Sequence, residues 1–85
     1  MRALAVELGP QGITANAIAP GFFLTEINAP FFGAPRIQEL ARRIPLRRFG
    51  QPDELVGAAI FLASDAASYV NGQVLTVDAG LGIAL

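Results

Sequence analysis

Residues 12–21 read Gly-Ile-Thr-Ala-Asn-Ala-Ile-Ala-Pro-Gly, and this stretch decides the fold. Residues 13–19 are small and largely apolar without a clean alternation, which is typical of a strand covered on both faces in a parallel sheet. Pro20 and Gly21 end the strand. Because ligands bind beyond the carboxyl ends of strands in open parallel sheets, we expect this turn to border a site.

The segments on either side of this strand have simple patterns. Residues 1–8 predict a helix with apolar side chains one turn apart. We expect Gly9 to close it in the left-handed conformation, and Pro10 prevents its continuation. After the strand, residues 22–32 form a loop with room for a short helix beyond Thr25.

Three further elements follow the loop. Residues 35–44 predict an amphipathic helix that begins at a proline. Residues 52–63 predict a second helix that is apolar on nearly every side, so it should be deeply buried. Residues 73–77 predict a strand, which residues 78–80 close. The order of helix, strand, loop, two helices and strand predicts an α/β fold with a parallel sheet.

The composition limits the size of the fold. The 85 residues allow one small domain at most. They are nevertheless 53% hydrophobic, with a mean hydropathy of +0.49, although short chains must keep much of their surface in water. Two strands alone also make no stable sheet. We therefore expect the chain to oligomerise or to pack against more protein.

The composition also argues against several classes of function. A net charge of −1 gives no basic field for nucleic acid. The chain has no Cys and no His, so we expect no metal site. The longest apolar run, residues 55–63, is far shorter than the roughly 20 residues that span a bilayer. Residues 1–7 do not read as a signal peptide. We expect a cytoplasmic protein without membrane contacts.

Five motifs carry a resemblance to a known family. They are AVELGP (5–10), GITANAIAPG (12–21), RIPLRRFGQPDEL (43–55), FLASDAASYVNGQ (61–73) and VDAG (77–80). In this order they resemble the short-chain dehydrogenase/reductases over nearly the whole chain. The resemblance implies an α/β fold that is the C-terminal part of a doubly wound, Rossmann-like parallel sheet. Residues 1–85 would then be a C-terminal fragment of a single domain that binds NAD or NADP.

The same resemblance implies a nicotinamide site in the loop after the first strand. The cofactor-binding residues would be Pro20, Gly21, Phe23 and Thr25. In the family, the backbone at the Phe23 position holds the carboxamide, and the hydroxyl at the Thr25 position contacts the carboxamide or the pyrophosphate. Without the family, these residues read as a strand-ending turn with Thr25 as a helix N-cap.

The following segment carries a second implied site. Asn28, Phe31 and Phe32 lie where the family has its substrate lid. A hydrophobic anchor that holds the loop to the core explains the two phenylalanines equally well.

The catalytic groups of the family have no counterpart in this chain. Its glycine-rich fingerprint, its catalytic Ser and its Tyr-x-x-x-Lys motif all precede the matched region. The chain contains no Lys, and Gln73 follows Tyr69 at the motif's spacing. The chain alone should be inactive, and the complete protein, expected to be a homodimer or homotetramer, should transfer hydride between NAD(P) and a secondary alcohol or ketone. Sugar acids or polyols are the favoured substrates. The alternatives are a non-catalytic interaction module and a truncated gene product.

The remaining polar groups predict structural roles. Four arginines cluster between the two helices: Arg42, Arg43, Arg47 and Arg48. Few aromatic residues and balancing acidic groups favour a solvated face or a subunit contact. Asp53 and Glu54 are neighbours on a helix and point in different directions, so they favour a helix start over a catalytic pair. Asp78 is expected to be structural. The family often has Gly where this chain has Arg47 and Ala79, which we interpret as sequence drift.

Overall fold

The computed structural model describes residues 1–25, 29–31 and 33–84. The helices and strands follow in the order α1 (Arg2–Leu8), β1 (Ala17–Pro20), α2 (Pro35–Arg43), α3 (Pro52–Ala63), β2 (Val74–Val77) and α4 (Leu81–Ala84). Short 3-10 turns occupy Gly9–Gln11, Ala29–Phe31 and Asp65–Ala67. Both predicted strands and the three predicted helices are therefore present.

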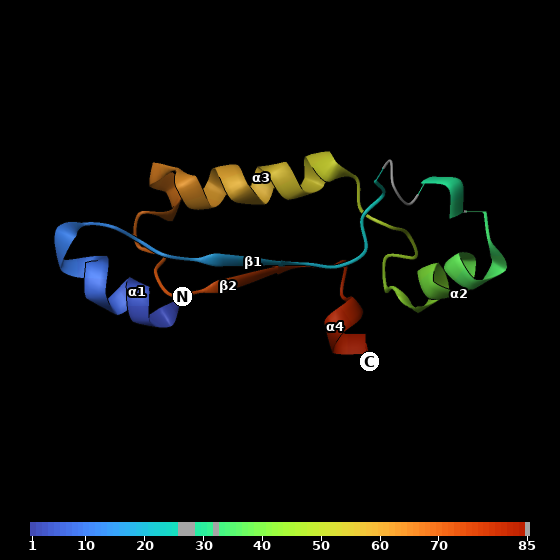
Figure 1. Cartoon of the computed structure of the whole chain (residues 1–85), viewed down its shortest axis with the longest axis horizontal. Helices are drawn as coiled ribbons and strands as arrows, with labels where there is room; N and C mark the ends of the chain where they lie inside the picture. Colours follow the sequence, from blue (N-terminus) through green and yellow to red (C-terminus); the bar gives the residue numbers. More distant parts are fainter. Residues whose placement is uncertain (26–28, 32, 85) are drawn as a thin grey trace.

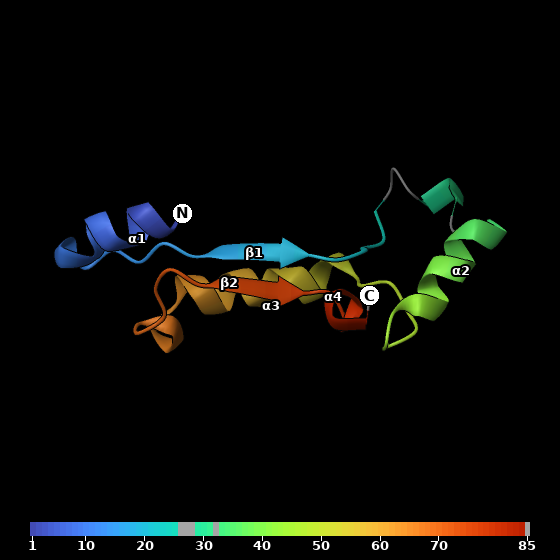
Figure 2. The same ribbon diagram turned by 90° about the horizontal axis from the view of Figure 1, so that it is seen from below.

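The two strands form a parallel pair. Their register runs from Ala17 opposite Val74 to Pro20 opposite Val77, so both carboxyl ends lie at the same edge. In Figure 1, α3 lies above the strands, and α1 and α4 lie below them. Helix α3 contacts both strands, whereas α2 stands beyond their carboxyl ends (Figure 2). Helices on both sides of a parallel pair confirm the expected α/β fold.

The end of α1 differs from the prediction. Gly9 stays in the right-handed region with φ −53°, and the chain continues through a 3-10 turn that contains Pro10. Gly12 is the left-handed residue, with φ +80°, and its amide donates to the Gly9 carbonyl. The proline was read as a stop, but Pro fits the first turn of a helical segment because its missing N–H needs no partner there.

Strand β1 begins at Ala17, later than the predicted start at residue 13. Before it, the Gly72 amide donates to the Ala15 carbonyl, and two asparagine side chains make the remaining bonds. The Asn71 Oδ1 accepts the Ala15 amide at 2.9 Å, and its Nδ2 donates to the Ala5 carbonyl at 3.0 Å. Asn16 Nδ2 donates to the Val70 carbonyl. Side chains of Asn readily satisfy backbone groups in this way, so the segment stays extended outside the sheet.

The predicted deep burial of α3 is wrong for this chain. Val56 is 54% exposed and Ile60 is 63% exposed. Among the described residues only Ala5, Ile44 and Ala67 are buried hydrophobic residues. A pair of strands covers only one stripe of a helix, so the rest of this apolar surface finds no cover within the chain.

Helix α4 was not predicted. The carboxylate of Asp78 accepts the amide of Gly80 at 3.0 Å and that of Gly82 at 2.8 Å. A carboxylate that takes the free amides of a first turn stabilises a helix start. The structural role expected for Asp78 is therefore confirmed.

Candidate functional site

The loop that follows β1 is attached to two other parts of the chain. The Gly21 amide donates to the Val77 carbonyl at 2.9 Å, which continues the pairing with β2 by one residue. Beyond it, the Phe22 carbonyl accepts the Gly50 amide at 2.9 Å, and the Leu24 amide donates to the Gly50 carbonyl at 2.8 Å. Residues 21–24 therefore have a fixed backbone between β2 and the start of α3.

The pairing with Gly50 sets the direction of the Phe23 backbone. Phe23 and Gly50 form a parallel bridge in which the neighbours of Phe23 make both hydrogen bonds. Since amide and carbonyl directions alternate along an extended chain, the N–H and C=O of Phe23 point away from Gly50. They take no part in the pairing with Gly50.

The aromatic side chains of this loop, Phe22 and Phe23, pack against residues 49 and 50. The rings of Phe22 and Phe49 meet edge to face, with centroids 5.9 Å apart and planes at 69°. A Cβ on Gly50 would lie 2.5 Å from the Phe23 ring. Glycine at position 50 therefore lets this ring rest directly on the backbone.

The presence of glycine at position 21 is explained by packing, which the sequence did not indicate. A Cβ at this position would lie 2.7 Å from the Asp78 Cβ and 2.8 Å from its Cα. The resemblance placed Gly21 among the cofactor-binding residues. The close neighbour in the fold is the end of β2, so Gly21 is required for packing whether or not a ligand is present.

A cavity of about 520 Å³ lies beside this loop. Its lining comprises Pro20, Gly21, Phe22, Phe23, Thr25, Phe31, Ile37, Leu40, Phe49 and Leu55. Its size falls in the range of small-molecule pockets, roughly 300–1,000 Å³. The structure thus brings together the four predicted cofactor residues and Phe31 in one largely apolar cavity.

The predicted substrate residues are placed in part. Phe31 is 62% exposed and lines the larger cavity, and both readings of its role stay predictions. Asn28 and Phe32 lie outside the described residues. The Thr25 carbonyl accepts the Ala29 amide at 2.9 Å. Whether the Thr25 hydroxyl contacts a cofactor or caps a turn stays a prediction.

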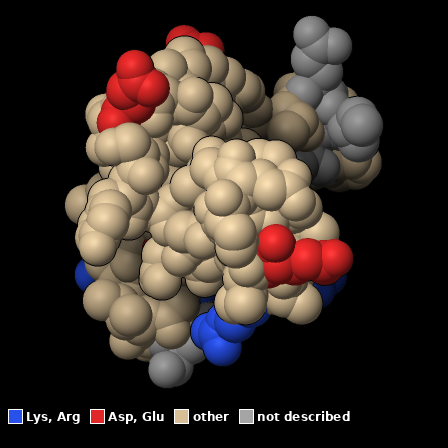
Figure 3. All heavy atoms as spheres, turned by 90° about the vertical axis from the view of Figure 1, so that its left-hand side faces the viewer, with Lys and Arg blue, Asp and Glu red and all other residues tan. Residues whose placement is uncertain are grey.

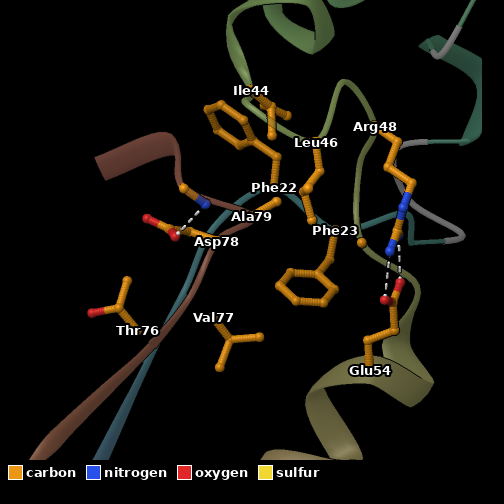
Figure 4. Close-up of a pocket in the computed structure, with 12 residues that line it drawn as sticks. Phe22, Phe23, Ile44, Leu46, Arg48, Glu54, Thr76, Val77, Asp78 and Ala79 are labelled. Carbon is orange, nitrogen blue, oxygen red and sulfur yellow. Dashed lines mark hydrogen bonds and ion pairs between the residues drawn. The ribbon is translucent and has the colours of Figure 1, made fainter. Parts of the chain in front are cut away.

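A second cavity, of about 380 Å³, shares Phe22 and Phe23 with the first. Ile44 and Leu46 line it from one side, and the end of β2 with Asp78 lines it from the other (Figure 4). Arg48 and Glu54 form an ion pair at its rim. Within the described ranges no buried side-chain nitrogen or oxygen lacks a partner.

The ion pair at this rim is the main electrostatic feature of the site. Arg48 donates to both oxygens of Glu54, at 2.7 and 2.8 Å, and the Gln51 amide donates to the same carboxylate at 2.9 Å. The Arg48 hydrogen bond, followed by that of Gln51, lowers the pKa of Glu54 to about 2. Glu54 also completes a capping box with Gln51, as expected for a helix start.

All four clustered arginines are exposed, as the sequence suggested, but two of them also make specific contacts. The Arg47 guanidinium donates to the carbonyls of Arg42 and Ile44, at 2.7 and 2.9 Å, and so closes the end of α2. Arg48 is held by Glu54. These two arginines therefore have specific intramolecular roles. Figure 3 shows one end of the molecule, on which charged side chains are few and scattered.

Other chemistries find little support in the described parts of the chain. No group of three His, Cys, Asp or Glu side chains there could hold a metal ion. No described helix is long and apolar enough to cross a membrane. Tyr69 lies in the turn before β2, at the amino ends of the strands, whereas the cavity lies beyond their carboxyl ends.

Comparison with known proteins gives consistent matches. A family model described as enoyl-(acyl carrier protein) reductase matches residues 1–82. Gluconate 5-dehydrogenase from Gluconobacter oxydans is 44% identical over 85 residues, which cover 99% of this chain and 33% of that protein. L-rhamnose 1-dehydrogenase (NAD(P)(+)) from Azotobacter vinelandii is 44% identical over 86 residues, which cover 100% of this chain and 34% of that protein.

Solved structures agree with the sequence matches. A gluconate 5-dehydrogenase from Burkholderia cenocepacia J2315, in complex with NADP and tartrate, has a TM-score of 0.87 at 46% identity. The match covers 99% of this chain and 33% of that one. The chain thus spans about a third of the length of these relatives. The family match over residues 1–82, the shared sequence and the shared fold show that the chain belongs to the short-chain dehydrogenase/reductase family.

Proposed function

We propose that this chain is the C-terminal part of an NAD(P)-binding Rossmann domain. The protein that contains it, called the complete protein below, would transfer hydride between NAD or NADP and a secondary alcohol or ketone. One observation carries the proposal: Pro20, Gly21, Phe23 and Thr25 line one cavity beyond the carboxyl end of β1. Ligands of doubly wound folds bind at this edge of the sheet.

The residues of the cavity fit a nicotinamide ring. The outward-facing amide and carbonyl of Phe23 match the acceptor and donor of a carboxamide. The Thr25 hydroxyl would contact the same group or the pyrophosphate. The apolar lining would exclude water from the ring. When the cofactor is bound, this ring would accept or donate the hydride. The groups that move the proton would come from outside this chain.

Sugar acids or polyols are the proposed substrates. Relatives named gluconate 5-dehydrogenase, D-threitol dehydrogenase and 5-keto-D-gluconate 5-reductase support this class. A 7alpha-hydroxysteroid dehydrogenase from Escherichia coli is 42% identical over 80 residues, so this region alone does not select the substrate. Phe31, Asn28 and Phe32 would border the substrate. A homo-oligomer in the cytoplasm is the proposed state.

The first test reads the DNA upstream of Met1 in the same frame. We expect a Tyr-x-x-x-Lys motif and a glycine-rich turn to be encoded there. An in-frame stop directly upstream would contradict the proposal and favour a truncated or non-catalytic product. The 85-residue chain itself should show no oxidation or reduction of NAD(P)(H) with a panel of alcohols and ketones.

The second test measures cofactor binding by the complete protein. Thr25→Val should raise the KM for the cofactor, because a hydroxyl contact is lost. Thr14→Val is the matched control, since it makes the same change at an exposed position before the amino end of β1. If both variants have the same KM for the cofactor, the Thr25 hydroxyl does not contact the cofactor. Failure of the unaltered protein to bind NADH or NADPH would overturn the proposed function.

A further inference from the structure

A carboxylate outside the proposed nicotinamide cavity holds both ends of the segment that supports the loop. Glu54 receives two hydrogen bonds from Arg48 and one from the Gln51 amide. Arg48 and Gln51 are the first and last residues of the segment 48–51. A single side chain at the start of α3 therefore fixes this four-residue segment at both ends. Figure 4 shows its two bonds to Arg48.

Phe49 and Gly50, in the middle of the segment 48–51, contact the loop that follows β1. Gly50 gives its amide to the Phe22 carbonyl and accepts the Leu24 amide. Phe49 packs edge to face against Phe22. The contacts of Glu54 and those of the loop thus meet on adjacent residues of one short segment, although Glu54 is not among the residues that line the larger cavity.

A plain surface ion pair is the alternative explanation. The side chains of Arg48 and Glu54 are 52% and 42% exposed, and exposed pairs generally contribute little to stability. This pair differs in geometry. It is bidentate, and the same carboxylate carries a backbone hydrogen bond at a helix N-terminus, where a negative charge is favoured. The arrangement specifies the position of the segment more than it strengthens the fold.

We propose that Glu54, paired with Arg48, is a positioning residue for the backbone of Phe22, Phe23 and Leu24, and through it for the bound nicotinamide. The inference rests on the proposed function, since it assigns Glu54 to the support of that cofactor site. Glu54 touches neither the cofactor nor the substrate. It acts by keeping Gly50 where the Phe23 amide is directed into the site.

The test compares two charge-neutralising variants of the complete protein. Glu54→Gln keeps the size of the side chain and an oxygen for the Gln51 amide, but it loses the charge that holds Arg48. Asp53→Asn is the matched control, because it removes the same charge from the same helical turn. We expect Glu54→Gln to raise the Kd for NADH or NADPH about two- to five-fold, the effect of an exposed ion pair.

Two readouts distinguish positioning from a general structural role. At saturating cofactor, kcat should be unchanged in Glu54→Gln while the KM for the cofactor rises. In a double-mutant cycle, Arg48→Gln should weaken binding to the same extent, and the double variant should be no weaker than either single one, because the pair acts as a unit.

Two outcomes would overturn the inference. In the first, Glu54→Gln has the same Kd for the cofactor as Asp53→Asn. In the second, the fold-increases in Kd caused by Arg48→Gln and Glu54→Gln multiply in the double variant. In both cases the unaltered protein still binds the cofactor, so the proposed function survives. If the unaltered protein binds neither NADH nor NADPH, the proposed function fails first and the inference falls with it.

Discussion

Arg47 and Ala79 adopt a left-handed backbone, with φ of +59° and +56°, although neither is glycine. Such a conformation is unfavourable for residues with a Cβ. These are the two positions at which the resembled family often has Gly. We interpreted the difference as sequence drift, and the structure gives it a physical meaning. Arg47 offsets its strain by binding two carbonyls at the end of α2.

Ala79→Gly should therefore stabilise the complete protein. Relief of left-handed strain, about 1–2 kcal/mol, exceeds the added entropy of the unfolded chain, about 0.4–1 kcal/mol. We expect a gain of roughly 0.5–1 kcal/mol in the free energy of unfolding, measured by urea denaturation. Gly72→Ala is the reverse experiment, because φ is +74° there and the new Cβ meets only ordinary contacts. It should destabilise, and a stabilising Gly72→Ala would refute the argument.

Gly50→Ala should disturb the loop. The added Cβ would lie 2.5 Å from the Phe23 ring, in a place where two hydrogen bonds fix the backbone. Overpacking of this kind costs about 1–3 kcal/mol in unfolding free energy. Adding Phe23→Leu should recover part of the loss by shortening the side chain.

Gly57→Ala is the control for this prediction. It makes the same change inside α3, where a Cβ meets nothing within 4 Å. It should stabilise the helix by about 0.5–1 kcal/mol. If Gly50→Ala is as well tolerated as Gly57→Ala, the ring does not depend on glycine at position 50.

At the scale of the elements, α3 begins with a charge arrangement that depends on pH. The pKa of Glu54 is lowered from 4.5 to about 2. A carboxyl group with a lowered folded-state pKa stabilises the fold above its unfolded pKa, and it loses this effect as pH falls toward the folded-state value. The contribution of Glu54 is thus complete above about pH 5, declines as pH falls toward 2, and is absent below about pH 1.

The difference in unfolding free energy between the unaltered protein and Glu54→Gln should follow this window. We expect it to be constant at neutral pH and to shrink as pH falls from 5 toward 2, as measured by urea denaturation at a series of pH values. Added salt should also reduce it, because the pair is exposed. A difference that grows on acidification would contradict the assigned sign.

Most elements could be predicted from local patterns. The sequence predicted the starts of α2 and α3 from their prolines, and it predicted that β1 and β2 are parallel. Helix α4 was not predicted, because Gly82 interrupts its short apolar sequence and its start depends on the Asp78 carboxylate. The late start of β1 was equally hidden, since it follows from Asn71, which lies 56 residues from Ala15. Local sequence cannot report bonds of that span.

The candidate site was predictable only in part. The position of Pro20 and Gly21 after a strand indicated where a site would lie, and the resemblance supplied the roles of Phe23 and Thr25. The contribution of Gly50 was missed, because its partner, the Phe23 ring, lies 27 residues away in the chain. The pairing of Arg48 with Glu54 was missed for another reason: the two residues are only six apart, but each was assigned to a separate cluster.

For the molecule as a whole, the main feature is uncovered apolar surface. The structure extends over 50 × 26 × 19 Å, and much of α3 faces outward. The composition predicted that the chain holds more apolar surface than it can bury. The location of that surface was predicted wrongly, since α3 was expected to be deeply buried.

The 85-residue chain expressed alone should therefore associate with itself and bind hydrophobic dyes. Val56 and Ile60 lie one helical turn apart on the exposed face of α3. The double change Val56→Glu and Ile60→Glu should shift the sedimentation profile toward monomer. Val6→Glu with Ile83→Glu is the control, because these exposed residues lie on two separate helices. A monomeric unaltered chain at all concentrations would contradict the prediction.

The parallel register of β1 and β2 has a consequence for biosynthesis. Ala17 pairs with Val74, and Asn71 binds Ala5 across 66 residues, so the contacts that define the sheet are almost entirely non-local. Contacts of high sequence separation form slowly, because a long loop must close before they are gained. During translation β1 must wait on the ribosome until residue 77 has emerged. The loop after β1 would thus acquire its final shape only after β2 has been made, and a chaperone that covers α3 in the meantime would shield its exposed apolar surface.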